Sequence, residues 1–149
     1  MALAKIVYAS MTGNTEAIAE LLEADFKEKG LEVVCEEVDD VDADYFDDAD
    51  ACIVATYTYN DGELPFDFED FHDELEDKDL SGKVYAVVGS GDSELYPDYF
   101  CHAAIDFDEV LAKTGAKKAA DVLKVENDPD DDDEKAIAEL VDKVVNALG

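Results

Sequence analysis

Short apolar runs alternate along this chain with longer segments in which apolar residues recur at helical spacing. The runs favour buried strands, and the segments favour helices that pack through one face. Strands that alternate with helices are typical of a parallel sheet covered on both faces, so the sequence predicts an α/β fold. The predicted strands are residues 3–8, 32–37, 51–56, 84–89 and 120–125, and the helical segments are 15–29, 68–75, 100–111 and 137–148.

The loops after the first, third and fourth predicted strands are the most unusual stretches in their chemistry. In an open parallel sheet, ligands bind outside the carboxyl ends of the strands, where the strand order reverses. Residues 9–15, 56–65 and 90–99 would all lie at that edge. The sequence therefore predicts a ligand site there.

The strand at 32–37 is less apolar than the others, which favours a position at the side of the sheet.

The first loop carries hydroxyl and amide side chains and has no lysine or arginine near it. Ser10, Thr12, Asn14 and Thr15 surround Gly13, just before a predicted helix. The free N–H groups at a helix start favour an anion by a few tenths to about 2 kcal/mol. The pattern matches neither the P-loop nor GxGxxG and favours a phosphate monoester held by neutral donors. A simple threonine or asparagine helix cap is the alternative.

The second and third loops combine tyrosines with turn residues. Tyr57 and Tyr59 follow a buried strand, and an aromatic ring there can stack on a planar ligand for about 1–3 kcal/mol. In the third loop, Gly91 allows close approach of the backbone, Asp92 or backbone amides can pair with a heterocycle edge, and Tyr96 adds a third ring. The alternatives are tyrosines that pack over the end of the sheet and an ordinary glycine-rich turn.

Taken together, the three loops resemble those of the flavodoxin family. SMTGNTE resembles the family's phosphate loop, TYTYNDGELP its second loop beside the flavin, and VVGSGDS followed by DYFC its third. The motifs occur in the family's order and spacing across the whole chain, and the fifth strand looks uninterrupted, as in the short-chain type. The resemblance implies a flavodoxin-like, doubly wound, five-stranded parallel sheet in the order 2-1-3-4-5. Helices would cover both faces, in a single domain over residues 1–149.

The resemblance also implies FMN, bound without a covalent link. Tyr59 would cover one face of the flavin, and Tyr96 or Tyr99 the other, with Tyr96 favoured. Backbone groups near Asn60, Asp92 and Tyr99 would address the edge of the ring. The expected cofactor-binding residues are Ser10, Met11, Thr12, Gly13, Asn14, Thr15, Thr56, Tyr57, Thr58, Tyr59, Asn60, Asp61, Gly62, Ser90, Gly91, Asp92, Tyr96, Tyr99, Phe100 and Cys101.

The implied function is that of a low-potential one-electron carrier between redox enzymes. No catalytic residue and no metal ligand is expected, because FMN would supply the redox chemistry. One alternative is an FMN protein dedicated to a single enzyme, for example in ribonucleotide-reductase activation. A cofactor-free acidic binding module is a further alternative. A phosphorylatable receiver domain is disfavoured, since Ser10-Met11 and Thr56-Tyr57 stand where that fold needs aspartates.

Acidic residues number 41 against eleven lysines and no arginine, a formal net charge of −30. Such a surface repels nucleic acid and anionic lipid and attracts basic-surfaced partners such as reductases and iron–sulfur or radical enzymes. The same charge disfavours self-association, so a monomer is expected. No signal peptide, membrane span or disulfide pattern is evident, and a cytoplasmic location is expected.

Overall fold

A parallel sheet forms the centre of the protein, whose computed structural model describes residues 3–8, 14–57, 66–91, 102–120, 122–126 and 131–148. The strand order is β2-β1-β3-β4, followed by a fifth position shared by β5 and β6. This confirms the predicted parallel sheet, its order and the outer place of the second strand. The strands are β1 (Leu3–Tyr8), β2 (Glu32–Glu37), β3 (Ala51–Tyr57), β4 (Val84–Gly91), β5 (Lys117–Lys118) and β6 (Leu123–Glu126).

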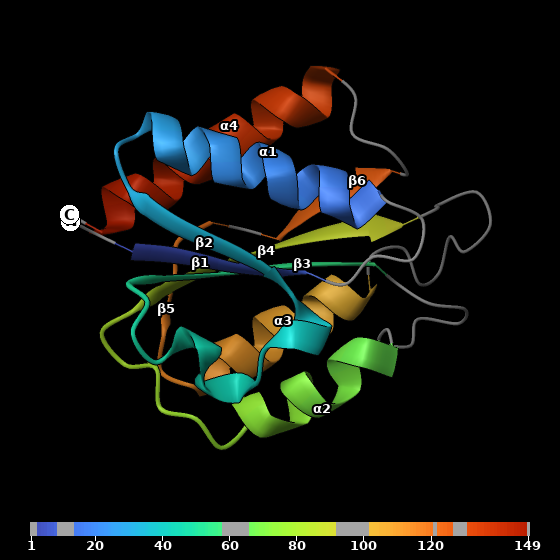
Figure 1. Ribbon diagram of the computed structural model, residues 1–149, viewed down its shortest axis with the longest axis vertical. Helices are drawn as coiled ribbons and strands as arrows, with labels where there is room; N and C mark the ends of the chain where they lie inside the picture. Colours follow the sequence, from blue (N-terminus) through green and yellow to red (C-terminus); the bar gives the residue numbers. More distant parts are fainter. Residues whose placement is uncertain are drawn as a thin grey trace.

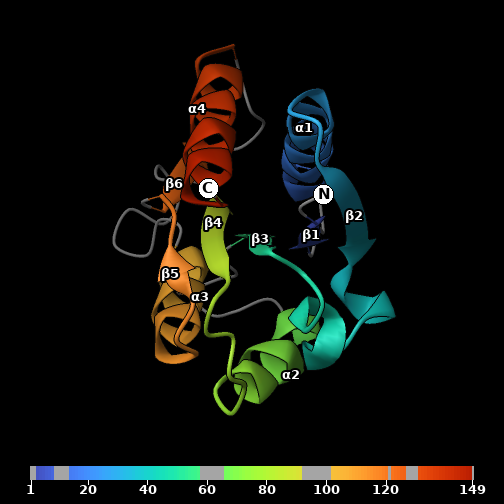
Figure 2. The same ribbon diagram turned by 90° about the vertical axis from the view of Figure 1, so that its left-hand side faces the viewer.

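Helices cover both faces of the sheet (Figures 1 and 2). Helices α1 and α4 lie side by side on one face, and α2 and α3 lie on the other together with the 3-10 helices η1 and η2. None of the described helices is long and apolar enough to cross a membrane. The helices are α1 (Asn14–Glu28), η1 (Val38–Asp40), η2 (Ala43–Phe46), α2 (Phe66–Leu75), α3 (His102–Lys113) and α4 (Asp131–Leu148).

Strand β3 is apolar on both of its faces because helices cover both. Ala51, Ile53 and Ala55 join the core under α1 and α4, whereas Cys52 and Val54 join the core over α2 and α3. All five side chains are fully buried. Complete burial of Ile53 and of Val54 contributes about 1.5–3 kcal/mol each, and the small side chains of Ala51 and Ala55 let the helices pack close to the sheet.

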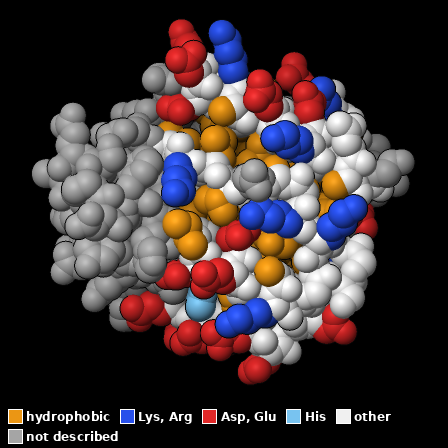
Figure 3. Space-filling view, turned by 180° about the vertical axis from the view of Figure 1, so that it is seen from behind, with side chains coloured by type: hydrophobic (Ala, Val, Ile, Leu, Met, Phe, Trp, Pro, Cys, Tyr) orange, Lys and Arg blue, Asp and Glu red, His pale blue; other side chains and the backbone are white. Residues whose placement is uncertain are grey.

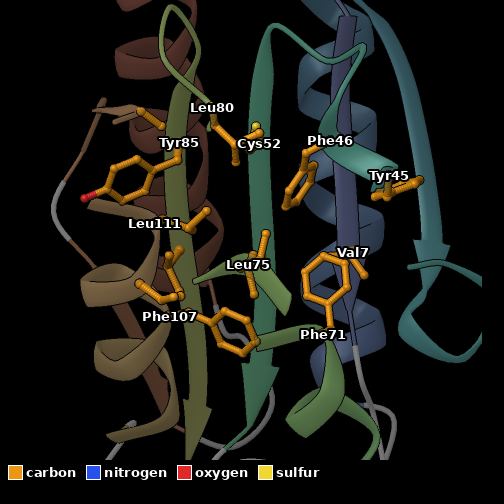
Figure 4. Packing of buried hydrophobic residues seen from close by; sticks show 14 of the residues in the cluster. Val7, Tyr45, Phe46, Cys52, Phe71, Leu75, Leu80, Tyr85, Phe107 and Leu111 are labelled. Carbon is orange, nitrogen blue, oxygen red and sulfur yellow. The ribbon is translucent and has the colours of Figure 1, made fainter. Parts of the chain in front are cut away.

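The core between the sheet and α2 and α3 is rich in aromatic rings (Figure 4). The ring of Phe71 in α2 meets Phe46 of η2 edge-on at 5.8 Å and lies 6.4 Å from Phe107 of α3. Such pairs add about 0.5–1.5 kcal/mol beyond the burial of their area. These contacts join three separate segments of the chain into one layer beneath the sheet.

The fifth strand is divided, which corrects the prediction of one uninterrupted strand at 120–125. Tyr85 of β4 pairs with Lys118, and Val88 pairs with Leu123. Between these two pairings β4 advances by three positions, whereas the other chain segment advances by five, so β5 and β6 do not form one continuous strand. A strand at the side of a sheet pairs through one edge only, so extra residues are tolerated there better than in a central strand.

The connection from β2 to β3 is held by Tyr45, a role that the sequence pattern did not predict. Its hydroxyl lies 2.9 Å from the carbonyl oxygen of Ile6 and 3.1 Å from that of Val34. Lys5 lies 4.8 Å above the Tyr45 ring and forms an ion pair of 2.6 Å with Asp48. The tyrosine thus ties η2 to the backbones of β1 and β2.

Replacing Tyr45 by phenylalanine should lower the free energy of unfolding by about 1–2 kcal/mol, since a buried hydrogen bond is lost while the ring remains. Urea unfolding measures the change. The denaturant dependence should stay the same if the native state keeps its compactness. An unchanged unfolding midpoint would show that the hydroxyl adds nothing to the attachment of η2.

Stability should fall at alkaline pH because the Tyr85 hydroxyl and the Cys52 thiol ionise less readily in the folded protein than in the unfolded chain. Burial raises the pKa of Tyr85 to about 12, with Asp108 adding to the rise, and burial raises the pKa of Cys52 to about 12. In the unfolded chain both groups lose their protons at lower pH. Their contribution to the free energy of unfolding is therefore complete below the pKa values of the unfolded chain and is lost as the pH rises toward 12.

Urea unfolding at a series of pH values measures this loss, at up to about 1.4 kcal/mol per pH unit for each group that has ionised only in the unfolded chain. In Tyr85→Phe the decline above the ordinary tyrosine pKa, about 10, should be shallower than in the parent protein. The lysines titrate equally in the parent protein and in Tyr85→Phe. Equal slopes of stability against pH in the two proteins would therefore show that Tyr85 does not cause the decline.

Candidate functional site

The carboxyl ends of β1, β3 and β4 lie at one edge of the sheet, and their pairing fixes how they are staggered. Tyr8, the last residue of β1, pairs with Ala55 of β3, so β3 continues two residues further, to Tyr57. Tyr57 in turn pairs with Ser90 near the end of β4. Helix α1 begins at the same edge (Figure 1). The three loops singled out in the sequence therefore all start from this edge.

The start of α1 is suited to an anion. Backbone N–H groups in the first turn of a helix have no partners within the helix, and the helix dipole favours negative charge there. Asn14 and Thr15 are the first two residues of α1. These features fit the predicted phosphate position.

The surroundings of this helix start are acidic. Burial raises the pKa of the Tyr8 hydroxyl, and the nearby carboxylates of Glu16, Glu37 and Glu20 raise it further. A phosphate at the start of α1 would therefore experience repulsion from these carboxylates. Neutral hydrogen-bond donors and the helix dipole would have to offset that repulsion.

Strands β3 and β4 end in small or polar residues beside the predicted flavin position. Thr56 is completely buried and is, with Thr114, one of two buried polar side chains among the described residues. It pairs in register with Gly89. Gly89 and Gly91 have no side chain, so the backbone of β4 can approach a ligand closely. The residues present here fit a planar cofactor at the edge.

The structure places six of the predicted cofactor-binding residues and brings them to this edge. They are Asn14 and Thr15 in α1, Thr56 and Tyr57 in β3, and Ser90 and Gly91 in β4. The other predicted residues lie outside the described residues, and their roles stay predictions. These are Ser10, Met11, Thr12, Gly13, Thr58, Tyr59, Asn60, Asp61, Gly62, Asp92, Tyr96, Tyr99, Phe100 and Cys101.

Sequence reasoning missed the contribution of the fifth strand to this edge. Glu126, the last residue of β6, pairs with Gly91 of β4, so it borders the same site. The rule that identified the three loops applies equally to this strand end. The acidic residues that follow residue 125 were the available signal.

The strand order reverses between β1 and β3, because the chain leaves β1 for β2 on one side and then returns to β3 on the other. A ligand crevice at such a point defines the class of doubly wound α/β proteins that bind a ligand at the carboxyl edge of the sheet. The predicted phosphate position at the start of α1 and the small residues of β4 fit a nucleotide-like ligand within this class.

Comparison with known proteins identifies the family. The model of the family described as flavodoxin matches residues 6–140, so the chain belongs to the flavodoxin family, as a short-chain member. It is 46% identical to the flavodoxin of Streptococcus pneumonia TIGR4, with a TM-score of 0.94 over 98% of this chain and 99% of that one.

Two further relatives agree with this assignment. A short-chain flavodoxin associated with a non-canonical PDU bacterial microcompartment is 35% identical, with a TM-score of 0.96 and complete coverage of both chains, 100% each. The probable flavodoxin 1 of Bacillus subtilis (strain 168) is 40% identical over 134 residues, which is 90% of this chain and 84% of the relative. The predicted family and fold are thus confirmed.

The phosphate position predicts a preference between flavins. Replacing both Thr12 and Thr15 by valine should remove hydroxyl donors to the phosphate and weaken FMN binding by about tenfold or more. Riboflavin, which has no phosphate, should lose much less affinity. Titration of the apoprotein with each flavin, followed by flavin fluorescence, measures both constants. Equal losses for the two flavins would place the phosphate elsewhere.

Proposed function

We propose that this protein is a low-potential one-electron carrier that holds one FMN without a covalent bond and passes electrons between redox enzymes. Flavodoxins are electron-transfer proteins, and the cofactor is FMN, as membership of the family supports. The observation that carries the proposal is that the strand ends from which the three predicted flavin loops start lie at one edge of the sheet, beside the start of α1.

In this proposal the protein binds, orients and shields the cofactor. FMN, when bound, supplies the one-electron chemistry that the side chains lack. The start of α1 binds the phosphate, and the ends of β3 and β4 support the flavin ring. No residue is assigned a role as acid, base or nucleophile on a substrate.

The acidic surface supports both the low potential and the choice of partners. Any negative charge that reduction leaves on a bound flavin would be disfavoured by carboxylates at this edge, among them Glu16 in the first turn of α1. One carboxylate about 10 Å away disfavours a new negative charge by roughly 1.7 kcal/mol at an effective dielectric constant of 20. The whole chain carries a formal charge of −30, so basic-surfaced reductases and iron–sulfur or radical enzymes are the proposed partners.

We also propose that the protein acts as a monomer in the cytoplasm. The net charge of −30 opposes association between copies. Cys35 and Cys52, the two cysteines among the described residues, are free thiols, which suits a reducing compartment.

Reconstitution with FMN tests the central proposal. The purified chain should bind one FMN and turn yellow, and a reductive titration should show two separate one-electron steps. A chain that takes up no flavin would instead be an acidic binding module. Reduction in a single two-electron step would contradict the role of a one-electron carrier.

Electron transfer to a basic partner should slow steeply as salt is added. Screening shortens the range of attraction to about 8 Å at physiological ionic strength, so the net charge of −30 steers encounters less well. Stopped-flow measurement with a basic flavodoxin reductase, across a salt series and with association limiting, is the test. A rate that stays flat from low to moderate salt would contradict electrostatic steering.

The same measurement with several redox enzymes distinguishes the two proposed kinds of carrier. Comparable rates with all of them would indicate a general carrier, whereas transfer to one enzyme alone would indicate a protein dedicated to it, for example in ribonucleotide-reductase activation.

A further inference from the structure

One segment of this acidic protein is basic. Residues 113–124 hold four of the eleven lysines, Lys113, Lys117, Lys118 and Lys124, and one acidic residue, a net charge of +3 in a chain of −30. The segment runs from the end of α3 through β5 into β6, which is the outer side of the sheet. Figure 3 shows this side of the molecule, where lysine side chains surround exposed hydrophobic ones.

A shallow depression lies beside this basic segment. Ala120, Val122 and Leu123 line it from the segment between β5 and β6, and Ala136 and Leu140 line it from α4. Its volume is about 190 Å³. Small-molecule and cofactor pockets usually measure about 300–1,000 Å³, so this depression suits a single apolar side chain of a larger partner.

Lysines lie in and next to the segments that line the depression. Lys143 of α4 and Glu139 complete its lining. Lys117 and Lys124 are exposed, and Lys118 pairs with Asp108 at 3.4 Å. We call the depression together with Lys117, Lys118, Lys124 and Lys143 the lysine edge.

We propose that the lysine edge is a second docking surface, which binds an acidic segment of a partner protein through the lysines and anchors one apolar side chain in the depression. Charge complementarity selects an acidic partner here, in contrast to the basic partners proposed for the cofactor edge. A carrier with two surfaces of opposite charge can stay attached to one protein while its cofactor edge exchanges electrons with another.

Protection of the sheet against strand addition does not explain the whole feature. Lysines on an outer strand hinder unwanted pairing with another chain, and this accounts for Lys117, Lys118 and Lys124. It does not account for Lys143, which lies on a helix, or for the apolar depression beside it.

The lysine edge should show an unusual dependence on salt. At low salt the net charge of −30 repels an acidic partner over a long range. Near physiological ionic strength, charges more than about 8 Å away are screened, so the distant carboxylates no longer repel the partner. The lysines close to the bound partner still attract it. At high salt that attraction is screened as well. Binding should therefore be tightest at intermediate salt, whereas attraction of basic partners to the protein declines throughout.

A defined peptide tests the proposal on the full chain loaded with FMN. The probe is a synthetic amphipathic peptide of about 20 residues, made of glutamate and leucine at helical spacing, and a scrambled peptide of equal charge is its control. Backbone NMR shifts of the labelled protein locate binding, and a titration gives the dissociation constant. We expect saturable binding, with shifts concentrated in residues 117–124 and 136–143.

Matched variants separate the lysine edge from net charge. Lys117→Glu with Lys124→Glu should weaken binding about tenfold, whereas Lys27→Glu with Lys29→Glu, an equal change in charge on α1 and the residues just after it, should change it less than about twofold. Ala136→Leu fills the depression without altering charge and should also weaken binding. The scrambled peptide should bind poorly to every variant.

Three results would overturn the proposal. One is an absence of saturable binding, which would leave the lysines as protection for the sheet. Another is equal weakening by the two lysine pairs, which would assign the effect to net charge alone. The third is binding to vesicles of phosphatidylcholine and phosphatidylglycerol in preference to the peptide, which would assign the surface to a membrane.

Discussion

The backbone hydrogen bonds that join β3 to β1 and β4 fix the register of the three strands and therefore the relative positions of their carboxyl ends. This register places Tyr57 beside Ser90 and ends β1 two positions before the end of β3. A slip by one residue would turn every side chain of β3 to the opposite face. Ala51, Ile53 and Ala55 would then exchange places with Cys52 and Val54, in two cores of different shape. The packing on both faces therefore determines the geometry of the cofactor edge.

The parts of the fold that depend on local pattern were predictable. The bounds of β1 and β2 agree with the apolar runs, and the buried residues Ile18, Leu22 and Phe26 of α1 follow the predicted helical face. The extension of β4 to Gly91 was not predicted, because glycine is a poor strand residue and is held here by pairing with Glu126. The role of Tyr45 depends on contacts with β1 and β2, which are distant in sequence, so no local pattern reveals it.

For the site, sequence reasoning could identify the edge but not its electrostatics. The general rule for parallel sheets placed all three loops at the carboxyl ends, and the six described residues lie there. The acidic surroundings of Tyr8 arise from Glu16 and Glu20 of α1 and from Glu37 of β2. These residues come together through the packing of α1 and the pairing of β1 with β2, which a one-dimensional pattern of charge does not contain.

Three lysines outside the lysine edge contact the connection between β2 and β3. Lys78 binds Asp44 and Asp47, at 2.7 and 3.0 Å, and Lys83 donates hydrogen bonds to the carbonyl oxygens of Asp47 and Ala49. Together with Lys5 on Asp48, they bring positive charge into the acidic connection between β2 and β3. Exposed ion pairs each contribute at most about 1 kcal/mol, yet here they also offset repulsion among neighbouring carboxylates.

The division of the fifth strand has a consequence for how the protein can change in length. Between Lys118 and Leu123 the chain has more residues than the part of β4 between their pairing partners, while β5 and β6 keep their pairing with β4. The entropic cost of closing a longer loop rises only by about 0.6 kcal/mol for each doubling of its length. Added residues at this point would leave the central strands and the start of α1 where they are. The interruption between β5 and β6 is therefore a natural insertion point, at which a new recognition segment or an engineered tether can be added without rebuilding the electron carrier.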